Sequence, residues 1–230
     1  MTKKEVKQTI ETKEKSNRNI FQEYSEALVV AVILAILIRA LLVQAFKIPS
    51  SSMEPTLLVG DHILVSKFIY GIRIPFTDAR WPHFKEPKTG DVIVFVFPDD
   101  RTKDFIKRVI AVGGDAVEVR NKHVFVNDKE VVIPQARALT NAVIPRYDSP
   151  RDNYGPVTVP TDHLFVMGDN RDFSQDSRFW GFVPVKDVKG EAFLIYYSSP
   201  FEKRPTQEEQ AAGYHVSHVN RFGRFFNWIH

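Results

Sequence analysis

The chain has 230 residues, of which 43% are hydrophobic and 26% are charged. This composition is typical of folded domains and excludes a disordered or collagen-like chain. The formal net charge is only +3 and the basic residues are scattered, so we expect no nucleic-acid partner. Because the chain has no cysteine, it contains no disulfide, no thiolate metal site and no cysteine nucleophile.

Residues 27–46 are the most apolar segment, and we predict that they form one transmembrane helix. Their first part is unbroken apolar sequence without a polar face, which disfavours a buried amphipathic helix. Arg39 stands near enough to the end of the segment for its side chain to reach the interface. Basic residues are frequent before the segment and sparse after it, so the positive-inside rule makes residues 1–26 a cytoplasmic leader and places residues 47–230 outside.

A cleavable signal peptide is an alternative interpretation of the same segment. Val43-Gln44-Ala45 is a small-x-small triplet of the kind that is cut after its last residue. Cleavage after Ala45 would release the exported part. The long charged leader and Arg39 argue against it.

The exported part is expected to be all-β, with mainly antiparallel sheets, because short runs of Val, Ile and Phe alternate with turn residues. Asn121-Lys122 and Asn127-Asp128 mark tight hairpins, and the proline-rich residues 134–160 are expected to be irregular. A smaller insertion at about residues 115–162 is expected to interrupt the domain. Gly-Asp pairs at 60–61, 90–91, 114–115 and 168–169 are expected as turns. Strands are predicted at 62–69, 91–97, 105–112, 117–120, 123–126, 131–133, 163–167 and 192–197.

The common hydrolase and nucleotide-binding signatures are absent from the sequence. There is no Gly-x-Ser-x-Gly elbow, no HExxH, no P-loop and no dinucleotide fingerprint. The seven histidines show no metal-ligand spacing, so we expect neither a metal nor a cofactor. A Ser-His-Asp triad has little support for the same reason.

Two places nevertheless carry reactive side chains in unusual settings. Three serines stand between Pro49 and Pro55, where the prolines disfavour a helix. A serine-rich linker is the alternative. Lys107 shares a strand face with Phe105 and Val109, so burial would lower its pKa and make it available as a general base. A lysine that reaches solvent from an edge strand is the alternative there.

Three segments together resemble, in order and spacing, the sequence boxes of bacterial type I signal peptidase, a membrane-bound Ser/Lys endopeptidase. They are PSSSMEPTL after the apolar segment, GDVIVF followed by DFIKRVIAVGGD, and GDNRDFSQDSRFWGFVP. The resemblance implies that Ser52 is the nucleophile and Lys107 its general base. It also implies that the Ser50 hydroxyl and the Ser52 N–H form the oxyanion hole, and that Ser174 orients the lysine.

The remaining site residues follow from the same resemblance. Asp176 and Arg178 would form a structural ion pair, and Asp169, Asn170 and Arg171 would have architectural roles. The substrates would be secretory preproteins cut after a small-x-small site such as Ala-x-Ala, docked by strand addition. The chain departs from the best-known members in having one anchor segment and a short insertion. The expected pocket residues are Phe46, Ile48, Pro49, Met53, Leu57, Asp104, Phe105 and Ile106.

The resemblance implies a bacterial inner or plasma membrane location, and aromatic residues suggest further contact with phospholipid. Phe76, Trp81 and Phe84 cluster in one predicted loop, and residues 221–229 mix arginine with aromatics. Packing of a last strand is an alternative for residues 221–229. Two rival functions are an anchored β-domain that binds exported proteins without cutting them, and a Ser/Lys protease like the self-cleaving repressors, which lack an anchor.

Overall fold

The computed structural model describes residues 20–36, 42–71, 84–199 and 221–230. The chain divides into two compact units, Met1–Leu42 and Val43–His230. Residues 20–36 of the first unit are helical, and every one of them is exposed. Among the described residues, no helix combines the length and the apolar character needed to cross a bilayer.

The predicted end of the N-terminal helix at residue 46 is wrong. Val43–Lys47 forms strand β1, which pairs antiparallel with β2 (Asp61–Ser66). Apolar content alone does not separate helix from strand in so short a stretch. Backbone pairing with β2 and packing of Phe46 against the core decide the conformation.

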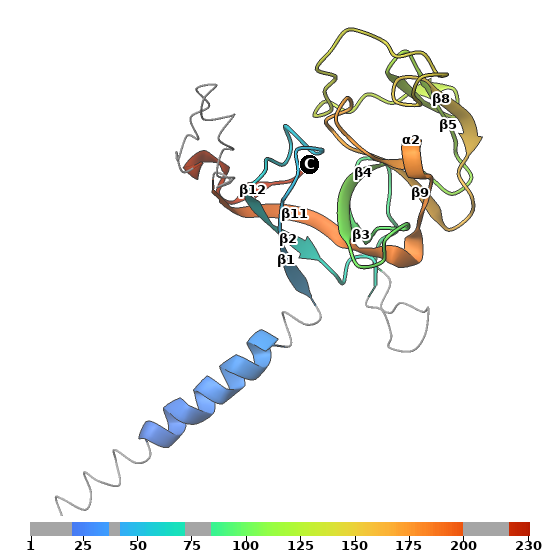
Figure 1. The fold of residues 1–230 in the computed structure, drawn as a ribbon. Helices are drawn as coiled ribbons and strands as arrows, with labels where there is room; N and C mark the ends of the chain where they lie inside the picture. Colours follow the sequence, from blue (N-terminus) through green and yellow to red (C-terminus); the bar gives the residue numbers. More distant parts are fainter. Residues whose placement is uncertain (1–19, 37–41, 72–83, 200–220) are drawn as a thin grey trace, which may run out of the picture. The chain divides into compact units, whose positions relative to one another are not determined.

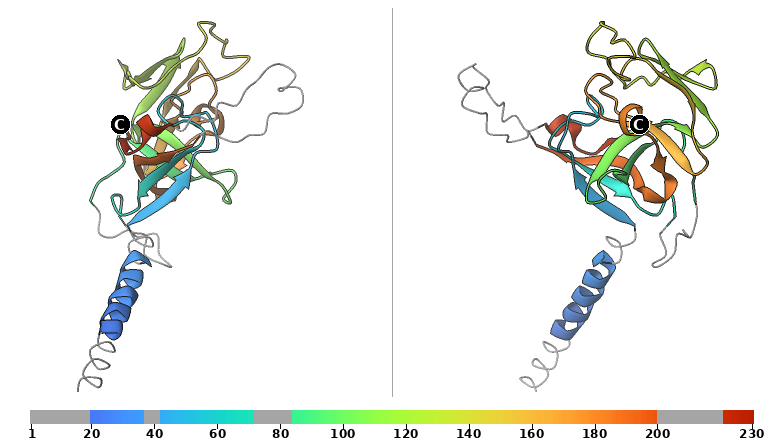
Figure 2. Two further views of the ribbon diagram at one scale, coloured as in Figure 1. Left: turned by 90° about the vertical axis from the view of Figure 1, so that its left-hand side faces the viewer. Right: turned by 45° about the vertical axis from the view of Figure 1, so that its right-hand side comes forward.

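The larger sheet contains eight strands, and all of its strand pairs are antiparallel, which confirms the predicted fold class for this unit (Figures 1 and 2). Its order is β1-β2-β11-β3-β4-β9-β10, with β12 paired to β11. The described residues of this unit also form the single-turn helix α2 and two 3₁₀ turns. The further bounds are β3 Val92–Val96, β4 Asp104–Val112, β9 His163–Met167, β10 Val183–Pro184, β11 Val188–Ser198, β12 Asn227–Trp228, α2 Ser177–Trp180, η1 Val185–Asp187 and η2 Phe222–Arg224.

A second sheet of four strands lies to one side of the first in each view of Figures 1 and 2. Its order is β7-β6-β5-β8. Asn121, Lys122, Asn127 and Asp128 all have positive φ, as two-residue hairpin turns require. The strands are β5 Ala116–Arg120, β6 His123–Val126, β7 Lys129–Glu130 and β8 Tyr154–Thr158.

Two predictions for this region are wrong. Residues 131–133 form no strand, and the chain leaves the sheet after β7. Residues 134–160 are not wholly irregular, because they contain β8. Its Pro156 is tolerated since β8 is the edge of its sheet, where a missing N–H leaves no neighbouring strand unpaired.

Strand β4 is buried on both faces. Phe105 and Val109 pack in one apolar cluster, while Ile106 packs in another with Ile48 and Met53. The apolar run of β4 therefore reflects a strand covered on both sides rather than one with a solvated face. This setting places the charged side chains of Lys107 and Arg108 inside the protein, whereas Asp104 at the start of β4 is exposed.

Candidate active site

Lys107 and Ser52 meet in the interior of the larger unit. Ser52 follows β1 in the segment that leads to β2, and Lys107 lies in β4. The Lys107 Nζ donates to the Ser52 Oγ at 2.7 Å and to the Ile106 carbonyl oxygen at 3.0 Å. Only 4% of Lys107 and 8% of Ser52 are exposed. The pair is therefore in direct contact and almost shielded from water.

The same burial changes the protonation of the lysine. Burial lowers the pKa of Lys107 to about 8, although the carboxylates of Asp176 and Asp169 act in the opposite direction. A lysine with this pKa is partly neutral near physiological pH. It can then accept a proton, which an ordinary surface lysine cannot do.

Ser50 lies beside the Ser52 hydroxyl. Its Oγ is 3.5 Å from the Ser52 Oγ, and the residue is exposed. A hydroxyl at this place can donate to an oxygen atom that approaches Ser52 from the solvent side.

Residues 168–178 contact the segment that carries Ser52. The Asn170 backbone N–H donates to the Ser52 carbonyl oxygen at 3.1 Å, and the Asn170 side-chain amide donates to the Ser51 carbonyl oxygen at 3.2 Å. Asp169 accepts a two-pronged contact from Arg108 at 2.8 and 2.7 Å and a hydrogen bond from Thr56. These contacts connect residues 168–178 with the Ser52 segment and with strand β4.

Sequence reasoning missed Thr56 and gave Arg108 no structural role. Arg108 is 2% exposed and Asp169 is fully buried. Removing one member of such a pair would leave an uncompensated buried charge. The signal in the sequence was an arginine inside an otherwise apolar strand, which needs an acidic partner.

Asp176 has two structural tasks. Its carboxylate accepts from Arg178 at 2.8 Å through both Nε and Nη2, and from the Gly168 N–H at 3.1 Å. Burial would raise the pKa of Asp176, but Arg178 and the Gly168 N–H lower it below the ordinary value. Asp176 also caps α2, a helix that the sequence analysis did not predict. The pattern of an aspartate five residues before a glycine was the available signal.

Gly168 occupies a crowded point between Ser52 and Ser174. A Cβ on Gly168 would stand 2.3 Å from the Ser174 Oγ and 2.4 Å from the Ser52 carbonyl oxygen. Gly60, Gly90 and Gly114 have positive φ, as their predicted turns require, but Gly168 does not. Gly168 is thus required for close approach rather than for a turn.

Ser174 and Arg171 are buried near this point. Among the described residues, no hydrogen bond joins the buried Ser174 Oγ to Lys107, and the orienting role of Ser174 stays a prediction. Burial and the neighbouring Arg178 lower the pKa of Arg171 to about 10, which leaves it charged at neutral pH.

The expected pocket residues divide into two groups. Phe46, Ile48, Met53, Leu57 and Ile106 pack in one cluster beside Ser52. The other three are outside this cluster. Pro49 is exposed, and Asp104 is paired with Lys189 at 2.7 Å. Phe105 is stacked on Phe97 with ring centroids 4.2 Å apart, and the centroid of its ring is 5.5 Å from the Lys107 Nζ.

Strand β4 has one free edge next to the lysine. Asp104 to Lys107 pair with β3, and the pairing of β4 with β9 begins only at Arg108. Within the described parts of the chain, residues 104–107 therefore have no strand partner on their second edge. An extended peptide can add there with its main chain beside Ser52.

Comparisons with known proteins show which family the chain resembles. The family described as "Signal peptidase, peptidase S26" matches residues 21–197. Signal peptidase I of Pseudomonas aeruginosa is 36% identical, over 83% of this chain and 78% of that protein. Probable signal peptidase I-2 of Synechocystis is 38% identical, over 87% of this chain and 84% of that protein. A solved signal peptidase I from Enterococcus faecalis is 28% identical with a TM-score of 0.37, over 46% of this chain and 97% of that one. On the sequence matches, the chain belongs to the signal peptidase family, peptidase S26, and is a serine peptidase.

Proposed function

We propose that the protein removes N-terminal signal peptides from exported preproteins, with Ser52 as nucleophile and Lys107 as general base. The observation that carries the proposal is the 2.7 Å contact between the Lys107 Nζ and the Ser52 Oγ in a buried site. The similarity to signal peptidase I proteins supports the substrate class.

The chemistry needs no group beyond these side chains and water. Neutral Lys107 takes the proton of Ser52 as its Oγ bonds to the scissile carbonyl carbon. The Ser50 hydroxyl and the Ser52 N–H donate to the oxygen that gains negative charge. The lysine then gives the proton to the leaving amine as the C–N bond breaks. In the second half, Lys107 takes a proton from water, which attacks the acyl ester, and returns it to the Ser52 Oγ.

The substrate would bind as an added strand. Its main chain would pair with the free edge of residues 104–107, and alternate side chains would point toward the cluster of Ile48, Met53 and Ile106. Side chains on that face have little room next to a packed cluster. This agrees with a requirement for small residues, commonly Ala-x-Ala, before the cut.

We also propose that the chain is held at a bacterial inner or plasma membrane, with residues 1–26 in the cytoplasm and the β-rich unit outside. The support is the apolar sequence that starts at residue 27 and the full exposure of the described helix over residues 20–36. The anchor must end before β1. Exposed Phe222, Phe226 and Trp228 support additional contact with phospholipid. Phe84 is also exposed, whereas Phe76 and Trp81 lie outside the described residues.

The function is tested by cleavage of a purified preprotein with an Ala-x-Ala site, in detergent with phospholipid. We expect the wild type to release a product whose new N-terminus follows the second alanine, as measured by mass spectrometry. Ser52→Ala should release none. Equal processing by both proteins would place the chemistry elsewhere, and cleavage by neither would favour an anchored binding domain.

The pH dependence of kcat/KM gives a second test. Because burial lowers the pKa of Lys107 to about 8, its neutral form increases as pH rises through that value. We expect kcat/KM to rise with pH to a plateau, with its midpoint near the pKa of the lysine, and to fall about tenfold per pH unit well below it. A profile that stays flat between about pH 6 and about pH 10, with chemistry rate-limiting, would exclude lysine as the base.

A further inference from the structure

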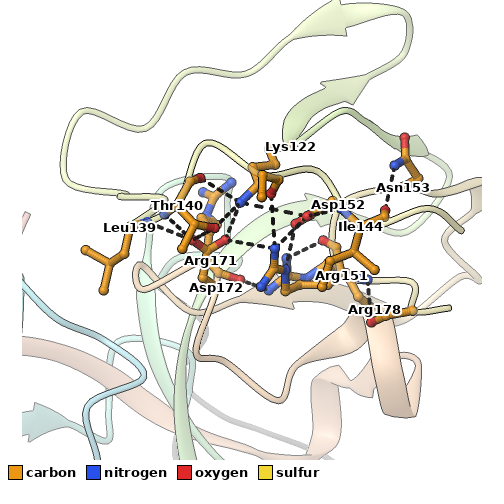
Figure 3. Close-up of polar contacts among 12 residues, drawn as sticks. Lys122, Leu139, Thr140, Ile144, Arg151, Asp152, Asn153, Arg171, Asp172 and Arg178 are labelled. Carbon is orange, nitrogen blue, oxygen red and sulfur yellow. Dashed lines mark hydrogen bonds and ion pairs between the residues drawn. The ribbon is translucent and has the colours of Figure 1, made fainter.

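Residues 168–178 face Ser52 and Lys107 on one side and the smaller sheet on the other. On the site side, Asn170 holds the Ser52 and Ser51 carbonyl oxygens, and Asp176 fixes the Gly168 N–H. On the other side, Asp172 points toward the turn between β5 and β6 (Figure 3). A displacement of Asp172 would therefore also displace the segment that carries Ser174 and Asp176.

Asp172 is fully engaged by that neighbouring region. Its carboxylate accepts from the Lys122 Nζ at 2.7 Å and from the Leu139 and Thr140 backbone N–H groups at 2.8 Å each. Only 1% of the Asp172 side chain and 12% of the Lys122 side chain are exposed. Burial alone would raise the pKa of Asp172, but the hydrogen bonds from Lys122 and Thr140 lower it to about 2. The Asp172 carboxylate therefore stays ionised at neutral pH.

Lys122 occupies a backbone position that does not suit lysine. Its φ is 73°, in the left-handed region that hairpin turns usually fill with asparagine or glycine. A long side chain there is disfavoured unless its contacts compensate. Besides Asp172, the Lys122 Nζ reaches the Thr140 carbonyl oxygen at 2.9 Å and the Thr140 hydroxyl at 3.1 Å. Only a side chain as long as lysine or arginine can make these contacts from the turn.

A second connection runs parallel to the first. Arg178, which is paired with Asp176, donates to the Arg151 carbonyl oxygen at 2.6 Å. Arg151 in turn pairs with the buried Asp152, and the Lys122 N–H donates to the Asp152 carbonyl oxygen at 2.9 Å. Figure 3 shows Lys122 and Arg151 next to Asp152 and Asp172. The small sheet and the site segment thus form one polar network.

We propose that Lys122 and Asp172 are a positioning pair, through which the smaller sheet holds residues 168–178 against the Ser52 and Lys107 site. Neither residue contacts the reacting atoms, and both act through the placement of Gly168, Asn170 and Asp176. The inference deepens the proposed function and rests on it.

The pair should influence the pH profile as well as the rate. The charged groups around the Lys107 amine are Asp169 and Asp176, which are paired with Arg108 and Arg178, and Arg171 lies among these four. Burial is the largest influence on the pKa of Lys107. If the site segment loosens and admits water, the pKa rises toward its ordinary value and the acid limb of kcat/KM moves to higher pH.

The test compares Lys122→Met, Lys122→Arg and, as a matched control, Lys129→Met on the exposed strand β7. We expect Lys122→Met to lower kcat about tenfold with little change in KM, and to move the acid limb upward by about half a pH unit. Arginine keeps the positive charge and a similar side-chain length. Lys122→Arg should therefore keep most of the wild-type kcat and leave the acid limb near its wild-type position. Lys129→Met should match the wild type.

Thermal unfolding of each variant separates positioning from general stability. A wild-type kcat in Lys122→Met would overturn the proposal. A lower kcat would also overturn it if the pH profile is unchanged and the loss of rate equals the loss of folded protein. If Lys122→Met does not fold, Lys122→Arg is the deciding variant. An unchanged kcat and pH profile in Lys122→Arg support the positioning pair. A loss of kcat as large as that of Ser52→Ala overturns the proposal. Wild-type cleavage by Lys107→Ala would instead refute the proposed function, whatever the Lys122 variants do.

Discussion

Lys107→Met is expected to lower kcat by about 10⁴-fold or more while the protein remains folded. Methionine keeps most of the buried stem of lysine but cannot accept a proton from Ser52. Without a base, the Ser52 hydroxyl stays protonated and is a weak nucleophile. Because burial already disfavours the charged amine, replacing it with an apolar side chain should not weaken the fold. Single-turnover cleavage of a preprotein measures the loss.

The double variant Ser52→Ala/Lys107→Met tests whether the two residues act in the same chemical step. Two residues that act as one unit have non-additive effects, so the double variant should be no slower than the worse single one. Additive losses would mean that the two residues serve separate steps. A Lys107→Met enzyme within about tenfold of the wild type would exclude lysine as the base.

Gly168→Ala is expected to lower both stability and activity. Its new Cβ would overlap the Ser52 carbonyl oxygen, which belongs to the backbone and cannot rotate away. Relief requires Ser52 or residues 168–178 to move. We expect a loss of about 3 kcal/mol in the free energy of unfolding and about 10²-fold in kcat, since displacement of a reactive group by about 1 Å has effects of that size. Urea unfolding and cleavage kinetics measure the two losses.

Gly223→Ala is the matched control for the glycine. A Cβ on Gly223 meets no atom within 4 Å, and this glycine does not have positive φ. The substitution should therefore leave stability and rate near the wild-type values. If Gly168→Ala and Gly223→Ala have the same free energy of unfolding and the same kcat, the absence of a Cβ at Gly168 is not required.

The parts of the fold that depend on local pattern could be predicted from the sequence. The run around Lys107 predicted a strand that buries a lysine, and the Asn-containing pairs predicted the two hairpin turns. Strand β9 was predicted with its observed bounds. In each case neighbouring residues determine the structure, through side-chain alternation or through the φ that a turn requires.

The parts that depend on distant partners could not be predicted in this way. β1 is a strand because β2 pairs with it, although its apolar sequence is equally suited to a helix. Thr56 contacts Asp169 across 113 residues, and Lys122 contacts Asp172 across 50. Nothing near Thr56 or Lys122 in the sequence indicates those partners. The resemblance to a family placed Ser52 and Lys107 in one site, whereas the composition of the serine segment alone fitted a linker equally well.

Under the proposed function, the free edge of β4 limits when a protein can be cut. A peptide that adds to residues 104–107 must offer unpaired main-chain N–H and C=O groups in an extended conformation. Strands inside a folded protein already use those groups, and loops rarely stay extended over several residues. An exported protein that has folded would therefore escape cleavage even where its sequence contains Ala-x-Ala. Protection of mature proteins then needs no inhibitor, because their own folding removes the substrate.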